Sequence, residues 1–304
     1  MSQLRKIKRK DLEVEKYAKA IEKALNYRIY AEAWYLDILT EEKWECWVYG
    51  DYEVVMPIPL QYKFGIKFVL QPIYCQQLGV FYREEISDEL FREFENKLHK
   101  YRVRAYHFNE ENTERYQPEG ERRTNFILDL SSEYKAIRTG YKDKRKKDIN
   151  RSKNHNLEVE KSWNLNFFYK LQKDFYSLLN PISEMEMKSS LLLKLLEKDS
   201  LRLFYIKKEG KYIAAQAFVY SKNRIYCLAF YRHKELDKYN SSAFIKNHLI
   251  ETEATQNLLL DFEGSMIPGV ASFIEGFGAE KRYFNKFSNF EFPVFLKKTL
   301  SKLR

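Results

Sequence analysis

Residues 258–279 read LLLDFEGSMIPGVASFIEGFGA, and this stretch decides the fold of the chain. The apolar run Leu258–Asp261 predicts a short strand, and Val270–Gly276 predicts a helix. Four of the ten glycines in the whole chain fall within residues 264–278. Glycine takes left-handed backbone conformations at little cost, so the chain needs backbone freedom between these two elements. The sequence therefore predicts a strand, a tight turn and a helix.

The C-terminal half around this stretch indicates a sheet flanked by helices. Turns at Glu209-Gly210 and Lys222-Asn223 separate three consecutive β-branched and aromatic runs, as antiparallel strands require. The other strands predicted in this half are Leu157–Glu160, Leu201–Lys208, Tyr212–Ser221, Arg224–Tyr231 and Arg282–Phe287. The other predicted helices are Leu165–Leu179, Glu184–Glu197 and Ser242–Gln256.

The N-terminal half has a similar order of elements. Apolar residues from Val14 to Leu25 recur at helical spacing and predict a first helix, and a polar stretch is expected at Asn109–Arg123. The other predicted helices are Ala31–Leu39 and Asp88–His99. The predicted strands are Trp44–Tyr49, Tyr52–Leu60, Lys67–Leu70, Leu78–Phe81, Val103–Phe108 and Asn125–Leu130. Two mixed, largely antiparallel sheets flanked by helices make an α+β protein. The expected domains are residues 1–132 and 157–304, joined by a basic linking helix at 133–156.

Composition excludes several classes of protein. The chain has 304 residues, of which 44% are hydrophobic and 16% aromatic, too many for a disordered chain. It lacks the glycine patterns of P-loop and dinucleotide-binding proteins. We expect no transmembrane segment and no secretory signal peptide, since no long apolar run is present. Cys46, Cys75 and Cys227 are isolated, which is typical of reduced thiols in a cytoplasmic protein.

The net charge of +10 is concentrated in two segments. Residues 1–10 carry five basic residues and no acidic one, and residues 135–153 carry nine basic residues and two acidic ones. Such segments favour polyanions, among them RNA. The alternatives are a frayed terminus and a solvated helix face. The residues expected to contact tRNA, if tRNA is a partner, are Lys142, Lys144, Arg145, Lys146 and Lys147.

The 258–279 stretch resembles the C-terminal signature of the Fem-like branch of the GNAT acyltransferase superfamily. This branch contains tandem GNAT proteins, including the aminoacyltransferases that build peptidoglycan crossbridges. Three N-terminal segments resemble the first domain of the same branch: Trp34–Asp37, Val55–Pro59 and Gln71–Phe81. The resemblance implies two tandem GNAT-like domains, with the acceptor side in the first and the donor side in the second.

The resemblance also implies a donor site at the helix that begins near Ser242. In the superfamily, the donor's phosphates bind backbone N–H groups at this helix start, where the helix dipole favours an anion. The usual pattern there is [QR]xxGxG or [QR]xxGxA, from which this chain departs at Lys238 and Ser241, so acyl-CoA and aminoacyl-tRNA both stay open as donors. An ordinary helix cap is the alternative. The residues of the implied site are Lys238, Asn240, Ser241, Ser242 and Ala243, with main-chain groups of Leu228, Ala229 and Phe230.

The chemistry of amide formation indicates three further residues. Asp261 and Glu263 are candidates to accept the proton of the amine, and Tyr231 is a candidate to protonate the leaving group. If the strand continued to Glu263, both carboxylates would point the same way. The alternative for Asp261 is to buttress the glycine turn.

Other candidate residues belong to the acceptor. Tyr74, Gln76 and Gln77 are expected to line an acceptor cleft, although buried glutamines bonded to backbone are the alternative. The five histidines lack metal-ligand spacing, so no metal and no tightly bound cofactor are expected.

The sequence thus predicts an N-acyltransferase that forms an amide bond. Its donor would be acyl-CoA or aminoacyl-tRNA, and its acceptor a small-molecule or envelope-precursor amine. A non-enzymatic alternative stays open: a protein that binds RNA or another partner on a degenerate GNAT scaffold.

Overall fold

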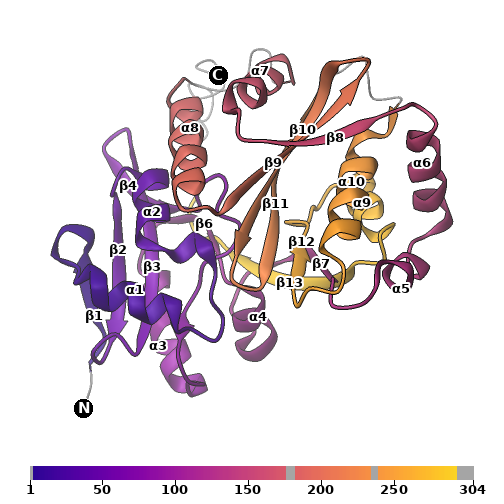
Figure 1. Ribbon diagram of the computed structural model, residues 1–304. Coiled ribbons are helices and arrows are strands. Elements are labelled where there is room, and N and C mark those ends of the chain that lie inside the picture. Colours follow the sequence, from indigo (N-terminus) through magenta and orange to yellow (C-terminus); the bar gives the residue numbers. More distant parts are fainter. Residues whose placement is uncertain (1–2, 176–181, 234–238, 293–304) are drawn as a thin grey trace. The chain divides into compact units, whose positions relative to one another are not determined.

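The computed structural model of the chain describes residues 3–175, 182–233 and 239–292 (Figure 1). The described residues form two units. Unit 1 contains residues 3–123, 186–191 and 283–292, and unit 2 contains the remaining described residues. Three elements contribute residues to both units: β7 (Glu121–Asp129), α8 (Ile182–Glu197) and β13 (Glu280–Phe287).

Unit 1 is built on a mixed sheet with strand order β1-β2-β3-β4-β6-β13, in which β5 also pairs with β3. Only the β4–β6 pair among these is parallel. The strands are β1 (Arg5–Lys8), β2 (Trp44–Tyr49), β3 (Val54–Lys63), β4 (Ile66–Leu70), β5 (Phe81–Tyr82) and β6 (Val103–His107). The helices are α1 (Val14–Glu22), α2 (Ala33–Thr40), α3 (Asp88–His99) and α4 (Glu110–Tyr116), with two 3-10 turns, η1 (Arg9–Asp11) and η2 (Ile29–Ala31).

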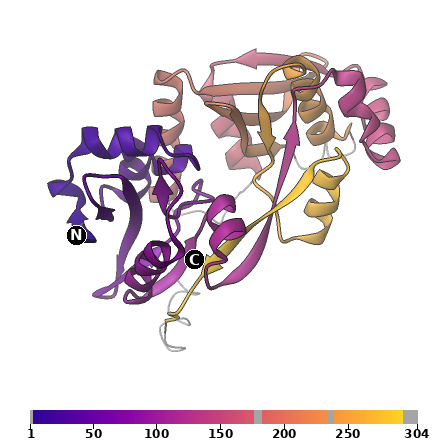
Figure 2. The same cartoon turned by 90° about the horizontal axis from the view of Figure 1, so that it is seen from below.

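Helices cover both faces of this sheet. Figure 2 shows α1 and α2 on one face and α3 on the other. The sequence of α3 explains its position: Ser87 caps its first turn, and Phe91, Phe94 and Leu98 recur at helical spacing and are buried. Phe91 stacks on Tyr116 of α4 with ring centroids 4.3 Å apart. This aromatic contact ties the two helices to the core.

The structure corrects two predictions in unit 1. The basic N-terminus is not a frayed end, because residues 5–8 pair with β2 and the Arg5 side chain donates to the Gly50 carbonyl at 2.7 Å. A short edge strand with mostly exposed basic side chains has no hydrophobic alternation to reveal it. The polar stretch 109–123 contains α4, whose first turn is capped by the Asn109 side chain.

In unit 2 the strands are also mixed, in the order β7-β12-β11-β10-β9-β8. Here only the β11–β12 pair is parallel. The strands, besides β7, are β8 (Glu158–Ser162), β9 (Leu201–Lys208), β10 (Lys211–Ser221), β11 (Arg224–Arg232) and β12 (Leu259–Asp261). The helices, besides α8, are α5 (Tyr134–Thr139), α6 (Asp143–Lys153), α7 (Leu165–Phe175), α9 (Ser241–Glu253) and α10 (Pro268–Glu275).

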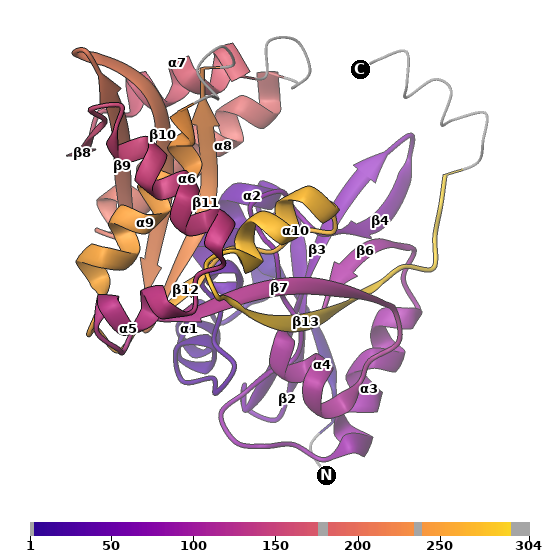
Figure 3. The ribbon, with the colours of Figure 1, turned by 90° about the vertical axis from the view of Figure 1, so that its right-hand side faces the viewer.

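The sheet of unit 2 is also covered on both faces. Figures 1 and 3 show α6 and α9 on one face of β9–β11 and α7 on the other. The core beneath α9 contains Phe204 and Ile206 from β9 and Ile225 from β11. Both units are therefore mixed, largely antiparallel sheets flanked by helices, and the predicted α+β fold class is confirmed.

The basic segment forms two helices of unit 2, α5 and α6, which are separated near Gly140. Arg145 does not face outward: its side chain is buried, donates to the Phe273 carbonyl at 2.9 Å and pairs with Asp148. The prediction that Arg145 contacts tRNA is therefore wrong, because its guanidinium packs against the rings of Phe273 and Phe277. Two of the four lysines in this prediction contact other residues: Lys142 pairs with Glu275, and Lys146 donates to the Thr139 carbonyl. Lys144 and Lys147 are exposed.

Candidate functional site

The parallel strands β11 and β12 diverge shortly after they meet. They pair over only three positions, Arg224–Tyr226 against Leu259–Asp261. β12 then ends, whereas β11 continues for six more residues to Arg232. Within the described residues, this last part of β11 has no strand partner on the β12 side. A strand edge of this kind is one to which the main chain of a ligand can add.

A β-bulge lies on β11 where this divergence begins. Cys227 and Leu228 stand between two paired positions of β11, opposite the single residue Phe218 of β10. An extra residue in one strand bends that strand and re-aims its backbone and side chains. The bulge therefore shapes the predicted main-chain contacts at Leu228, Ala229 and Phe230.

The start of α9 lies beyond the end of β11. Asn240 is the N-cap residue, but it has a left-handed φ of 51° and its side chain makes no cap hydrogen bond. Ser241 is 2% exposed, and its Oγ has no hydrogen-bond partner among the described residues. Ser242 and Ala243 complete the first turn, whereas the predicted Lys238 lies outside the described residues. The expected ordinary side-chain cap is therefore absent at Asn240, although α9 keeps the N-terminal dipole that favours an anion.

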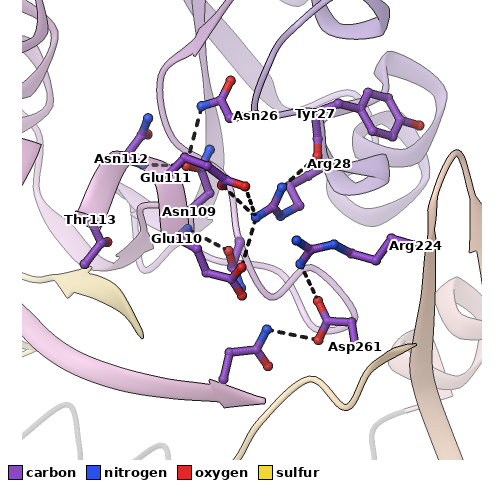
Figure 4. Close-up of polar contacts among 12 residues, drawn as sticks. Asn26, Tyr27, Arg28, Asn109, Glu110, Glu111, Asn112, Thr113, Arg224 and Asp261 are labelled. Carbon is purple, nitrogen blue, oxygen red and sulfur yellow. Dashed lines mark hydrogen bonds and ion pairs between the residues drawn. The ribbon is translucent and has the colours of Figure 1, made fainter. Parts of the chain in front are cut away.

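The turn after β12 is organised by Asp261. Its buried carboxylate accepts hydrogen bonds from Arg224 Nη1 at 2.8 Å, Asn125 Nδ2 at 3.0 Å and the Glu263 backbone N–H at 2.8 Å. Figure 4 shows Arg224 directed at this carboxylate. At Gly264 φ is 55°, and a Cβ there would lie 2.1 Å from the Thr124 carbonyl oxygen. These contacts favour the buttressing role for Asp261.

Glu263 and Tyr231 are placed differently from Asp261. Glu263 is half-buried and has a φ of 57°, so the strand does not continue to it. The two carboxylates consequently do not follow strand alternation, which corrects that expectation. Tyr231 is buried, and its ring lies 4.9 Å from that of Phe168 on α7. Tyr231 therefore packs toward α7 and not toward α9.

One residue of this region was missed by sequence analysis. Lys246 lies in the second turn of α9 and is 7% exposed. Its Nζ donates to Gln216 Oε1 at 2.9 Å and to Ser242 Oγ at 3.1 Å. Burial lowers the pKa of Lys246 to about 8, since the interior disfavours the charged form. The sequence did carry a signal, because α9 has no continuous polar face and so predicts burial on most sides.

Gln216 fixes the surroundings of Lys246. Its Nε2 donates to the Ala229 carbonyl at 2.9 Å and to the Ala217 carbonyl at 3.2 Å, which directs its Oε1 to the lysine. The Phe230 ring centroid lies 4.9 Å from the ammonium. Lys246 is therefore held against β10 and β11 beside the bulge.

In unit 1, the predicted acceptor residues are held by protein contacts. Gln77 is fully buried, and its side chain bonds the Glu110 backbone N–H at 3.0 Å and the Glu110 carboxylate at 3.1 Å. The Gln76 carbonyl oxygen lies 2.8 Å from His107 Nδ1. Tyr74 has a φ of 62°, and its carbonyl accepts a hydrogen bond from Tyr35 at 2.5 Å. Gln77 thus anchors the start of α4, as expected for a buried glutamine bonded to the backbone. A binding role for all three residues stays a prediction.

A buried arginine completes the polar network around Gln77. Arg28 Nη2 contacts Glu111 Oε2 at 2.7 Å and Glu110 Oε2 at 3.4 Å (Figure 4). Both Arg28 and Glu110 are buried. The cation therefore has two carboxylate partners, so its charge is compensated within the protein.

Neither a metal site nor a membrane-spanning helix is found among the described residues. No three of their His, Cys, Asp or Glu side chains are grouped closely enough to hold a metal ion. None of their helices combines the length and the apolar content that a membrane span requires.

Comparison with solved structures identifies the fold, although no protein-family model and no curated protein sequence matches the chain. FemX matches with a TM-score of 0.66 at 11% identity, over 98% of this chain and 99% of FemX. L-PGS from Bacillus licheniformis matches with a TM-score of 0.54 at 13% identity, over 95% and 96% of the two chains. A conserved protein of unknown function from Bacteroides thetaiotaomicron matches with a TM-score of 0.55 at 11% identity, over 95% and 100%.

These similarities extend over nearly the whole of both chains in each comparison, so they include both units. At such low identity they concern the fold. The parallel strand pair in each unit agrees with this result. The chain has the Fem-like fold, a tandem of two GNAT-like units.

Proposed function

We propose that the protein is an N-acyltransferase that forms an amide bond between an activated acyl group and an amine. The observation that carries this proposal is the divergence of β11 and β12 beside the uncapped start of α9. An open strand edge suits the extended arm of a donor, and the helix start suits its phosphates. Acyl-CoA contains both parts, and aminoacyl-tRNA offers phosphates close to its aminoacyl ester. The proposed donor is one of the two.

The corresponding strand pair in unit 1 is closed by the chain itself, which favours unit 2 as the donor side. After β4, the Gln71 N–H donates to the Ala105 carbonyl, and the Leu78 N–H donates to the His107 carbonyl, each at 2.8 Å. The segment between them therefore occupies the edge of β6. We therefore assign the donor to the corresponding edge of β11 in unit 2. The amine acceptor is assigned to unit 1, beside Tyr74 and Gln76.

The reaction requires a neutral amine, a polarised carbonyl and a proton for the leaving group. The amine nitrogen bonds to the acyl carbon, the carbon–sulfur or carbon–oxygen bond to the donor breaks, and the proton of the amine ends on the leaving group. Glu263 is the proposed proton acceptor: it is half-buried beside the turn after β12, whereas the buried Asp261 carboxylate accepts three hydrogen bonds. Tyr231 packs toward α7, which argues against its predicted role as the proton donor.

Thermal unfolding in the presence of candidate donors tests the proposal. The ligands are acetyl-CoA, coenzyme A and total tRNA, each added separately to the full chain. A donor at about 100 times its dissociation constant stabilises the folded state by about 2.7 kcal/mol. Stabilisation by acetyl-CoA or coenzyme A indicates an acyl-CoA enzyme, and stabilisation by tRNA alone indicates an aminoacyl donor.

A transfer assay follows with the donor that binds. Loss of the acyl group from the donor is measured with and without a lysine-containing peptide as the amine. Amine-dependent loss supports the proposal, and Glu263→Gln should then reduce the rate while the donor still stabilises the fold. If no donor stabilises the protein and no acyl group is transferred, the partner-binding scaffold is the correct reading.

A further inference from the structure

The described residues that contact the Lys246 ammonium are all uncharged. Its two hydrogen bonds go to neutral oxygens, Gln216 Oε1 and Ser242 Oγ. The aromatic rings of Phe230 and Phe273 lie 4.9 Å and 5.9 Å from Nζ. Within the described part of the chain, no carboxylate lies at ion-pair distance from this ammonium.

Such an arrangement is costly in a protein interior. A buried charge loses its hydration, so buried charges are normally paired with an opposite charge or bound to a metal ion. The hydrogen bonds and the Phe230 ring recover only part of that loss, since they contribute dipoles and a quadrupole. Among the described residues, this cation therefore lacks the negative charge that normally accompanies a cation in a protein interior.

A second, independent feature lies on the same helix. Ser241 Oγ, in the first turn of α9, is buried and has no hydrogen-bond partner among the described residues. Buried hydroxyl groups nearly always form a hydrogen bond, so a ligand can supply the partner that Ser241 Oγ lacks among the described residues. Ser242 connects the two features, because it follows Ser241 and accepts the hydrogen bond from Lys246. An unbonded hydroxyl group and a lysine without a carboxylate partner among the described residues thus both lie in the first two turns of α9.

We propose that Lys246 is an anion-binding residue of unit 2, whose ammonium pairs with a phosphate or carboxylate oxygen of the bound substrate. The position of Lys246 inside α9 distinguishes this role from binding by the helix dipole, which acts in the first turn alone. An anionic oxygen there would replace the missing counter-charge and have apolar walls formed by Phe230 and Phe273. The inference rests on the proposed function for the identity of the substrate, but not for the existence of the anion site.

Titratable groups around Lys246 are few. Cys227 on β11 is a neutral thiol, since burial raises its pKa to about 12, and Arg145 on α6 is a further cation. The neighbours from β10 and α10, Gln216 and Phe273, do not titrate. Anion binding should therefore require protonated Lys246 and weaken as the pH rises above about 8.

Binding of two simple anions tests this proposal. Sulfate represents a phosphate and succinate represents a carboxylate, and neither changes its charge between pH 7 and pH 10. Affinity is measured by titration calorimetry at constant ionic strength for the wild type, Lys246→Met and Lys144→Met. Lys246→Met should bind at least ten-fold more weakly and lose the dependence on pH. Lys144→Met removes the same charge from an exposed position and should bind like the wild type.

The two anions separate the two sources of negative charge. A loss of sulfate binding alone assigns Lys246 to a donor phosphate, and a loss of succinate binding alone assigns it to a carboxylate. Equal affinity of Lys246→Met and wild type for both anions overturns the proposal, as does the absence of binding to the wild type.

A second variant introduces a carboxylate of the protein beside Lys246. Ser242→Asp places a carboxylate at the atom that now accepts from Lys246, and an acidic residue in the first turn of a helix is favourable. We expect this variant to melt at a higher temperature than the wild type and to lose anion binding. Ser87→Asp, at the start of α3, is the control without a neighbouring buried lysine. If Ser242→Asp melts lower and binds anions normally, Lys246 does not need a counter-charge.

The transfer assay separates this inference from the proposed function. Lysine-dependent anion binding without transfer of any acyl group leaves the anion site intact and removes the enzyme. Transfer at the wild-type rate by Lys246→Met leaves the enzyme intact and overturns the role of Lys246.

Discussion

Each unit contains one pair of parallel strands, β4–β6 in unit 1 and β11–β12 in unit 2. The two pairs differ in what lies beside them. In unit 1, the segment after β4 returns to β6, and Gln77 in that segment joins the network of Arg28 and Glu110. In unit 2, β12 ends while β11 continues, and the partners of the cation Lys246 among the described residues are neutral. In unit 1, the chain itself pairs with the edge beside the strands, and the cation Arg28 has carboxylate partners. In unit 2, the strands diverge, and Lys246 has no carboxylate partner among the described residues.

The difference indicates how the two units divide their work. A buried cation with carboxylate partners contributes to specific packing, and removing one partner leaves an expensive unpaired charge. A buried cation with neutral partners lowers stability and is kept where a ligand completes it. Fold similarity alone does not make this distinction, because both units carry the same strand arrangement. The charges beside the strands make it.

The largest effect should come from breaking the closed network of unit 1. Arg28→Met leaves Glu110 buried without its cation, and we expect it to lower the free energy of unfolding by about 3–5 kcal/mol. Urea unfolding followed by circular dichroism measures this loss. Arg115→Met is the matched control, because Arg115 is exposed and pairs with Glu85, and it should cost no more than about 1 kcal/mol. Similar costs for both variants would remove the contrast between the networks.

The open region of unit 2 should respond to pH in a way that unit 1 does not. The pKa of Lys246 is about 8 in the folded chain and 10.5 ordinarily, so the unfolded chain binds more protons between these values. The stability of the wild type should therefore rise relative to Lys246→Met, by about 2–3 kcal/mol between pH 7 and pH 10. Urea unfolding of both proteins at several pH values checks this. A difference that is constant with pH would show that Lys246 is protonated throughout.

Asp261 tests whether all charges in unit 2 behave like Lys246. Its carboxylate is fully partnered, so it should resemble Arg28. Asp261→Asn keeps the shape but removes the negative charge that pairs with Arg224, and we expect a loss of about 2 kcal/mol in the free energy of unfolding. The loss should be the same at pH 7 and pH 9. An unchanged or raised stability would place Asp261 with Lys246, as a charge kept for function.

The smallest effect is expected at exposed charges. Lys144 and Lys147 lie on α6 and are exposed, so the double substitution to Glu should change the free energy of unfolding by less than about 0.5 kcal/mol. The same variant also tests RNA binding, for which filter binding with total tRNA at low salt is suitable. Unchanged binding would exclude these two lysines as tRNA contacts. A large loss of stability would mean that charge on α6 matters for folding even at its surface.

Sequence analysis predicted the elements well where periodicity is strong. The α3 helix has its cap and its buried Phe91 and Phe94 at regular spacing, so its bounds were correct. It failed for β1 and α4, where a short basic strand and a polar helix bury too few apolar residues to leave a pattern. It also misjudged Arg145, because charge in a sequence does not reveal which face of a helix is covered.

The sequence by itself determined the fold class and the glycine turn after Asp261, because both depend on local patterns and on backbone conformations that few residues adopt. Tertiary structure decided which charges are neutralised. Gln216, Ser242 and Lys246 come from two elements, and nothing in their spacing shows that they meet without a carboxylate from the other described residues. Counter-charges are supplied by neighbours in space, so the availability of Lys246 to an anion became visible only once the chain had folded.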